Sequence, residues 1–178
     1  MKLVNLIEED FTNYRKPGMF LGFPYCSGKC NPKDDLPVCQ NQHLHCAKLI
    51  DISIDEIIDR YRKNRVVKCL IFGGMEPFDS LYDLNELIAQ FRSKHDLSYS
   101  WDPIVIYTGY YPFEIEDQLA AITSVNNNMP LIVKFGRYIP GHKPHYDPVL
   151  GVKLASDNQY ALQYSWEEAG PVWNNFTY

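Results

Sequence analysis

Four of the five cysteines in this 178-residue chain lie within one short stretch. They are Cys26, Cys30, Cys39 and Cys46, in the segment GFPYCSGKCNPKDDLPVCQNQHLHCAK, whereas Cys69 lies in an apolar run and is expected to be a small core residue. Thiolates are the soft ligands that zinc and iron–sulfur clusters prefer. Unpaired thiols are the alternative, but so many in one turn-rich loop favour a metal or an iron–sulfur cluster.

The spacing of these cysteines is compatible with two kinds of site. Zinc sites usually contain two short Cys-x2-Cys or histidine-containing pairs, and this chain has no Cys-x2-Cys. Cys46 and the two histidines just before it would nevertheless complete a four-ligand zinc site. Three thiolates, from Cys26, Cys30 and Cys39, would instead leave one iron of a four-iron cluster open to a substrate.

A second group of chemical interest, the sequence GGMEP at residues 73–77, follows a predicted buried strand. Gly73 and Gly74 allow backbone groups near Met75 to approach a ligand closely, and exposed amides and carbonyls bind a charged amino-acid moiety. Glu76 adds an anion for an ammonium group. The alternative is an ordinary turn that leads into a helix, where Gly-Gly before Glu-Pro is common.

The pattern of apolar residues predicts the elements that carry these groups. Short apolar runs predict strands at Gly18–Tyr25, Val66–Phe72, Pro103–Tyr110 and Met129–Gly136. Helical spacing predicts helices at Ser53–Asn64, Leu81–His95 and Phe113–Thr123. Alternating strands and helices form parallel βαβ units, and the chain is too short for a complete eight-unit barrel of about 250 residues. We therefore predict an α/β fold, a partial or open barrel of mainly parallel strands.

Four notable segments fall at the ends of predicted strands: the cysteine loop, GGMEP, YTGYY and FGRYIPGHK. Ligands of such sheets bind at the carboxyl ends of the strands, so these segments are expected to converge. After Gly136 no further helix is predicted, and residues 137–178 are expected to be irregular apart from a possible strand in QYALQYSW. The sequence predicts one domain, residues 1–178, with its core at about 18–136.

Composition and charge restrict the kinds of partner that the protein can bind and the compartment in which it is expected. A net charge of −5 provides no basic field for nucleic acid or for an anionic membrane. No apolar run approaches the roughly 20 residues that span a bilayer, and acidic residues stand where a signal peptide would be apolar. The odd number of cysteines argues against a disulfide framework. We expect a cytoplasmic protein that binds neither nucleic acid nor membrane.

Taken together, these motifs resemble the radical S-adenosylmethionine superfamily. There, three cysteines, usually spaced C-x3-C-x2-C, hold a [4Fe-4S] cluster, and a following GGEP-like motif holds the methionyl amine of S-adenosylmethionine. The chain is most similar to the activating enzymes of anaerobic (class III) ribonucleotide reductases, over about residues 18–160. Four further segments carry this similarity: Cys39–Asn41 (CQN), Tyr107–Tyr110 (YTGY), Lys134–Ile139 (KFGRYI, like DGRF) and Ser156–Gln159 (SDNQ).

The resemblance implies cofactors, site residues and partners. The cluster ligands would be Cys26, Cys30 and Cys39, and the contacts to S-adenosylmethionine would be Gly73, Gly74, Met75, Glu76, Asn41 and Thr108. The reduced cluster would cleave S-adenosylmethionine to methionine and a 5′-deoxyadenosyl radical, which would take a hydrogen atom from a glycine of the reductase. The implied partners are an anaerobic ribonucleotide reductase and an electron donor such as flavodoxin or ferredoxin. This chemistry requires no general acid or base.

Two departures from the family pattern leave alternatives open. Eight residues separate Cys30 from Cys39 where two are usual, so Cys46 is an alternative third ligand, although the Cys-x-Asn match favours Cys39. GGMEP is one residue longer than GGEP, so either Glu76 or the backbone near Met75 would face the amine. Two other functions also stay open: a radical enzyme acting on a small molecule of the queuosine-precursor type, and a non-catalytic zinc-binding α/β module.

Overall fold

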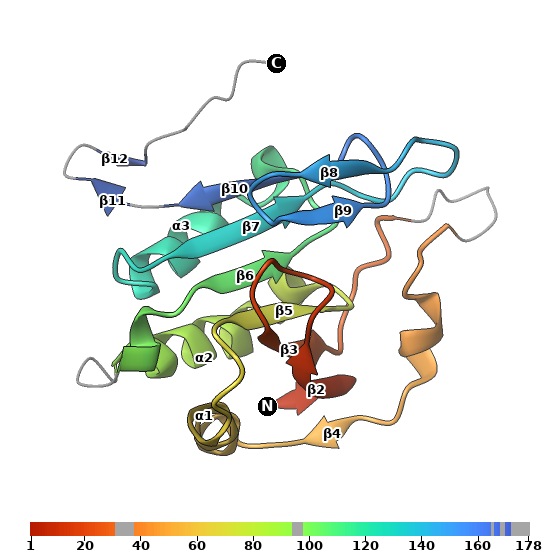
Figure 1. Ribbon diagram of the computed structural model, residues 1–178. Helices are drawn as coiled ribbons and strands as arrows, with labels where there is room; N and C mark the ends of the chain where they lie inside the picture. Colours follow the sequence, from red (N-terminus) through yellow and green to blue (C-terminus); the bar gives the residue numbers. More distant parts are fainter. Residues whose placement is uncertain (31–37, 94–97, 165, 168–169, 172–178) are drawn as a thin grey trace.

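A six-stranded mixed sheet forms the centre of the computed structural model, which describes residues 1–30, 38–93, 98–164, 166–167 and 170–171 (Figure 1). The strands lie in the order β10-β7-β6-β5-β3-β2. They are β2 (Asn5–Asp10), β3 (Gly18–Phe23), β5 (Leu70–Gly74), β6 (Ile104–Tyr107), β7 (Leu131–Phe135) and β10 (Tyr160–Tyr164). The four central strands are parallel, and β2 and β10 pair antiparallel at the edges. Over the described residues the edges do not pair, so the α/β prediction is confirmed without a closed barrel.

Three α-helices in the described part of the chain connect the parallel strands and cover one face of the sheet. They are α1 (Ile54–Lys63), α2 (Leu81–Ser93) and α3 (Glu116–Val125). Because the parallel strands follow one another in chain order, right-handed crossovers place every helix on the same face. Their buried apolar residues form one core with alternate strand residues such as Leu70 and Phe72. None of the described helices is long and apolar enough to cross a bilayer.

Shorter elements complete the described structure. The remaining strands form three antiparallel pairs, β1 (Lys2–Leu3) with β4 (Ile50–Asp51), β8 (His145–Asp147) with β9 (Val152–Leu154), and β11 (Trp166–Glu167) with β12 (Gly170–Pro171). The short 3-10 helices are η1 (Gln42–Cys46), η2 (Pro77–Ser80), η3 (Ser98–Trp101) and η4 (Pro112–Glu114). The hairpin of β8 and β9 lies over the face of the sheet that the helices leave free (Figure 1).

The predicted strands and helices are all present, although several of their ends differ. The strand predicted at Val66–Phe72 begins only at Leu70, because Asn64 Oδ1 accepts hydrogen bonds from the amides of Val66 and Val67 and holds a turn there. The helix predicted from Phe113 begins three residues later, after the 3-10 turn η4. The prediction of a helix N-terminus at Ser53 is confirmed, since its hydroxyl accepts from the amide of Glu56.

Besides the short pairs β1–β4 and β11–β12, two parts of the structure that line the cavity were not predicted from the sequence. The edge strand β2 has the sequence NLIEED and is largely exposed, so it lacks the apolar signal of a buried strand. The prediction that residues 137–178 are irregular apart from one possible strand is wrong, because they also include the hairpin of β8 and β9. Both hairpin strands are only three residues long, too short for a periodic pattern to be recognised. The predicted last strand is confirmed as β10.

A smaller apolar cluster fills the amino-terminal half of the helix-free face. Tyr14 from the β2–β3 loop and Leu150 from the β8–β9 turn meet there over strand residues such as Ile71. The amide of Arg15 donates to the carbonyl of Leu150 over 2.8 Å, so the two connections are bonded across the face. Cys69 belongs to this cluster as expected, and burial raises the pKa of its thiol to about 12. The carboxyl-terminal half of the face is left for a cavity.

Candidate functional site

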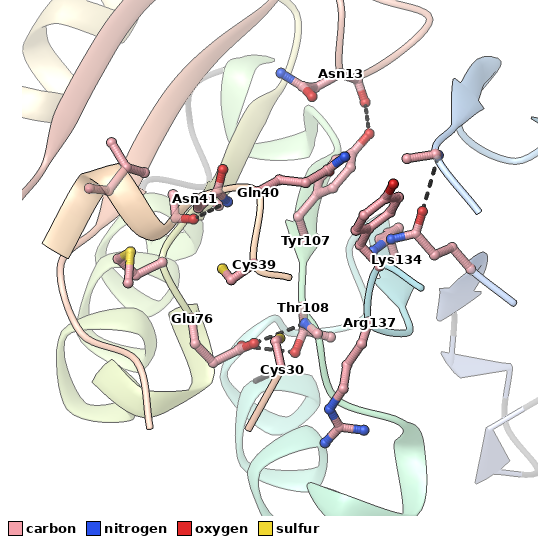
Figure 2. Close-up of a pocket in the computed structure, with 18 of the residues that line it drawn as sticks. Asn13, Cys30, Cys39, Gln40, Asn41, Glu76, Tyr107, Thr108, Lys134 and Arg137 are labelled. Atoms are coloured by element: carbon pink, nitrogen blue, oxygen red, sulfur yellow. Dashed lines mark hydrogen bonds between the residues drawn. The ribbon is translucent and has the colours of Figure 1, made fainter. Parts of the chain in front are cut away.

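A cavity of about 480 Å³ lies on the helix-free face, at the carboxyl ends of the parallel strands (Figure 2). Its volume is in the range of small-molecule sites, about 300–1,000 Å³. Every site residue predicted from the sequence lines it: Cys26, Cys30, Cys39, Asn41, Gly73, Gly74, Met75, Glu76 and Thr108. The structure therefore brings the cysteine loop, GGMEP and the end of β6 together around one space.

The cysteines of the loop differ in where they lie. Cys26, Cys30 and Cys39 are partly buried and line the cavity, whereas Cys46 is exposed and is not among the lining residues. Burial raises the pKa of the Cys26 thiol and raises that of Cys30 to about 11. Within the described residues no three Cys, His, Asp or Glu side chains are grouped closely enough to hold a metal ion. Residues 31–37, between the second and third cysteines, lie outside the described part.

The Cys26–Cys30 segment is fixed to the sheet by a hydrogen-bonded network. Asp79 accepts from the amide of Ser27 over 2.5 Å and from the hydroxyl of Tyr110 over 2.7 Å. The hydroxyls of Ser27 and Tyr110 lie 2.8 Å apart, and the ammonium of Lys29 lies 4.6 Å from the centre of the Tyr110 ring. Sequence reasoning did not single out Ser27 or Asp79, because neither belongs to a recognisable motif.

The returning part of the cysteine loop is held by Asn41. Its side-chain amide donates to the carbonyl of Gly74 over 2.6 Å. Cys39 lies two residues earlier and therefore stands close to the end of β5, in the cavity wall (Figure 2). The side-chain amide of Asn41 thus joins the cysteine loop to GGMEP.

The two glycines of GGMEP are needed because β3 and β5 leave no room for a side chain. Gly74 has φ of +81°, and a Cβ there would lie 2.6 Å from the Cα of Gly22. A Cβ on Gly73 would lie 2.9 Å from the ring of Phe20. Gly22 pairs with Gly73 in the parallel register, so two residues without side chains lie side by side. The amide of Met75 donates to the carbonyl of Phe23 at the end of β3, and that of Glu76 donates to the carbonyl of Tyr25 just beyond it.

Glu76 is buried and is bonded to the end of β6. Its Oε1 accepts from the hydroxyl of Thr108 over 2.8 Å and from the amide of Phe78, and its Oε2 accepts from the amide of Gly109 over 2.9 Å. Burial raises the pKa of this carboxyl to about 7, against the opposing effect of these hydrogen bonds. Glu76 and Thr108, both predicted to contact the cofactor, thus contact each other while lining the cavity.

The raised pKa of Glu76 predicts a pH-dependent stability. The unfolded carboxyl ionises near pH 4.5 and the folded one near pH 7, so the folded state binds the proton more tightly. The contribution of Glu76 to the free energy of unfolding should therefore fall by about 3 kcal/mol as the pH rises through this interval. Urea unfolding of Glu76→Gln should lack this slope, whereas Glu116→Gln, at an exposed position of α3, should keep it. Equal slopes in wild type and Glu76→Gln would contradict the assignment.

Lys134 on β7 is a cavity residue that sequence reasoning did not select. Its side chain is 6% exposed, and its ammonium donates to the carbonyl of Gly136 over 2.7 Å. Burial lowers its pKa to about 8, which the nearby carboxyl of Glu76 opposes. The sequence did contain a signal for Lys134, because this lysine interrupts the otherwise apolar strand LIVKF. The neighbouring Arg137 bonds to Glu114 over 2.6 Å.

The late SDNQ segment shapes the turn after β7. The side chain of Gln159 accepts from the amide of Ser156 and donates to the carbonyl of Gly136. Asn158 donates to the carbonyl of Arg137 over 2.8 Å. The motif therefore stabilises the turn that carries Arg137 to the cavity wall.

No family model, curated protein or solved structure matches the chain. The cavity itself combines three thiols, a strand end lined by glycines, a buried carboxyl and a buried ammonium. Thiols suit a soft metal or an iron–sulfur cluster, and exposed backbone groups beside opposite charges suit a zwitterionic amino-acid moiety. The cavity therefore offers thiols for a metal or cluster and charged and backbone groups for an amino-acid moiety in the same place.

Proposed function

We propose that this protein is a radical S-adenosylmethionine enzyme that forms a glycyl radical on an anaerobic ribonucleotide reductase. The observation that carries the proposal is that Cys26, Cys30, Cys39 and the GGMEP segment line one cavity at the carboxyl ends of parallel strands. The strand order adds support, because parallel strands in chain order with helices on one face are compatible with an open (β/α) barrel. The family resemblance of the motifs supplies the reaction.

The residue types at the cavity suit a [4Fe-4S] cluster, although the thiols of Cys26, Cys30 and Cys39 are not grouped as metal ligands in this structure and would have to draw together to bind it. Cys26, Cys30 and Cys39 would hold it through three thiolates, which leaves one iron free, and all three residues line the cavity. Cys46, an exposed residue outside the cavity lining, is not required. The ligands must lose their protons on binding, so cluster assembly is favoured by higher pH.

The cavity also fits the amino-acid end of S-adenosylmethionine. Carbonyl groups at Gly73–Met75 would accept from its ammonium, and the Lys134 ammonium would donate to its carboxylate. When bound, the reduced cluster and S-adenosylmethionine supply cleavage of the sulfonium C–S bond and a carbon radical that takes a hydrogen atom from glycine. The chain binds and orients both groups, while Glu76 and Thr108 hold the strand ends in register.

Anaerobic reconstitution with iron and sulfide tests the proposed function. The protein should turn brown and, when reduced, should cleave S-adenosylmethionine to methionine and 5′-deoxyadenosine. Addition of the reductase should then give a glycyl radical in the electron paramagnetic resonance spectrum. A colourless protein that retains one tightly bound zinc would exclude the radical chemistry. Cleavage without a radical on any reductase would favour an enzyme acting on a small molecule.

Replacing Lys134 by methionine should weaken binding of S-adenosylhomocysteine, measured by calorimetry, by about 10- to 100-fold. The physical reason is that a charge-assisted hydrogen bond to the carboxylate contributes about 1.5–3 kcal/mol. An analogue without the carboxylate should bind the wild type and Lys134→Met equally. Equal weakening for both ligands would indicate that Lys134 acts only through the structure of the cavity.

A further inference from the structure

The cysteine loop is attached at both of its ends to one short segment, residues 74–79, which begins at the last residue of β5 and runs into η2. We call residues 24–30 the first arm of the loop and residues 38–41 its second arm. The first arm contains two of the cavity cysteines, and the second contains Cys39. The first three residues of the segment line the cavity as well, so the segment supports the thiols and the amino-acid end of the site together.

The first arm is held by the carboxylate of Asp79. One oxygen of Asp79 accepts from the amide of Ser27 over 2.5 Å, and the other accepts from the hydroxyl of Tyr110 over 2.7 Å. The hydroxyls of Ser27 and Tyr110 lie 2.8 Å apart, so the three residues form a closed ring of contacts beside Cys26. All three lie outside the cavity lining, so Asp79 reaches the cavity through the first arm.

The second arm is held by Asn41 at the other end of the segment. The side-chain amide of Asn41 donates to the carbonyl of Gly74 over 2.6 Å. The carbonyl of Asn41 accepts from the amide of Leu44 in η1, so the same residue also joins the arm to that helix. Cys39, two residues before Asn41, is therefore placed relative to the end of β5 by this one side chain.

The thiols of the two arms meet in the cavity. Figure 2 shows Cys30 and Cys39 entering one space from different parts of the loop. Burial raises the pKa of Cys30, and the neighbouring thiols of Cys39 and Cys26 raise it further. Within the described residues these thiols are not grouped as metal ligands, so binding of a metal or cluster requires the arms to move. The attachment of each arm decides where its thiols start.

We propose that Asp79 and Asn41 are positioning residues for the metal-binding thiols, Asp79 for those of the first arm and Asn41 for Cys39. For Asn41 this differs from the cofactor contact that the family resemblance implies. The inference rests on the proposed function for the identity of the cluster, whereas the places of the metal-free thiols do not depend on it. Loss of one such hydrogen bond should raise the population of an open arm about 3- to 10-fold.

Asp79→Asn tests the first attachment in the metal-free protein. Alkylation with iodoacetamide, followed at each cysteine by mass spectrometry, should become about 3- to 10-fold faster at Cys26 and Cys30. At Cys39 it should stay within about twofold of wild type. Asp83→Asn is the matched control, because Asp83 lies in the first turn of α2, outside the cavity lining. It should leave every rate unchanged.

Tyr110→Phe separates position from charge, because Asp79→Asn also removes a negative charge near the thiol of Cys26. The phenylalanine keeps the buried ring and leaves the Asp79 carboxylate in place, but it loses the hydroxyl of the closed ring of contacts. Both thiols of the first arm should react about 2- to 5-fold faster, with no change in the second arm. Wild-type rates in Tyr110→Phe beside faster rates in Asp79→Asn would assign the effect to charge and overturn the role of Asp79.

Asn41→Leu tests the second attachment by the opposite pattern. It removes the amide donor at similar size, so alkylation should become about 3- to 10-fold faster at Cys39 and stay within about twofold of wild type in the first arm. Cys69 reports on folding, because it is buried in the core and reacts when the whole protein opens. Equal effects on both arms, or faster reaction at Cys69 together with the other thiols, would overturn the proposal.

Reconstitution with iron and sulfide separates this inference from the proposed function. Asp79→Asn and Asn41→Leu should assemble the cluster at least about threefold more slowly than wild type and Asp83→Asn, as followed by visible absorption. Wild-type assembly rates in both variants would overturn the two positioning roles and leave the proposed function standing. A wild-type protein that assembles no cluster would remove the proposed function, whereas arm-specific alkylation would still support the two attachments.

Discussion

Replacing Cys39 by alanine is expected to abolish cluster assembly and cleavage of S-adenosylmethionine, whereas Cys46→Ala should leave both at wild-type level. The reason is position, since Cys39 lines the cavity with Cys26 and Cys30, and Cys46 is exposed outside it. A cluster held by two protein thiolates has lost one of the three ligands that fix its position. The measurements are the iron and sulfide content and the visible spectrum after anaerobic reconstitution, followed by product analysis.

The other cysteines provide controls for this result. Cys26→Ala and Cys30→Ala should behave like Cys39→Ala, and Cys69→Ala should still assemble a cluster although it removes a buried core side chain. Loss of the cluster in Cys46→Ala with retention in Cys39→Ala would assign the third ligand to Cys46. Retention in every single variant would contradict a three-thiolate site.

Gly74→Ala is expected to lower the free energy of unfolding by about 2–5 kcal/mol and to disrupt the cavity. A left-handed conformation costs a residue with a Cβ about 1–2 kcal/mol, and overpacking between strands costs about 1–3 kcal/mol more. Here the added Cβ would lie 2.6 Å from the backbone of Gly22, which cannot rotate away as a side chain would. Urea unfolding monitored by circular dichroism measures the loss.

Gly28→Ala is the matched control for the strain at Gly74. Gly28 also has positive φ, +76°, but an added Cβ there would have nothing within 4 Å. Its replacement should therefore cost only the conformational part, about 1–2 kcal/mol. Equal losses in the two variants would show that the close approach of β3 and β5 contributes nothing to stability. A larger loss in Gly74→Ala would show that the close approach of β3 and β5 adds to the cost of the substitution.

Much of the fold could be predicted because its signals are local. The apolar runs that became β3, β5, β6 and β7 lie between recognisable helices, and chain order alone then implies parallel pairing. The edge strand β2 escaped prediction because exposed strands carry no apolar pattern, and the hairpin of β8 and β9 escaped because its strands are too short. Both missed elements form the helix-free side of the cavity.

The sequence by itself determined the α/β alternation and the placing of the cysteine loop, GGMEP and Thr108 at strand ends, because periodicity and chain order decide these. Only the tertiary structure decided that Cys39 lines the cavity while Cys46 is exposed, that Glu76 bonds to Thr108, and that Lys134 is buried beside them. The physical reason is that the direction and burial of a side chain depend on segments far away in the chain. Glu76 accepts a hydrogen bond from Thr108, 32 residues later in the chain, and Asn41 donates one to Gly74, 33 residues later.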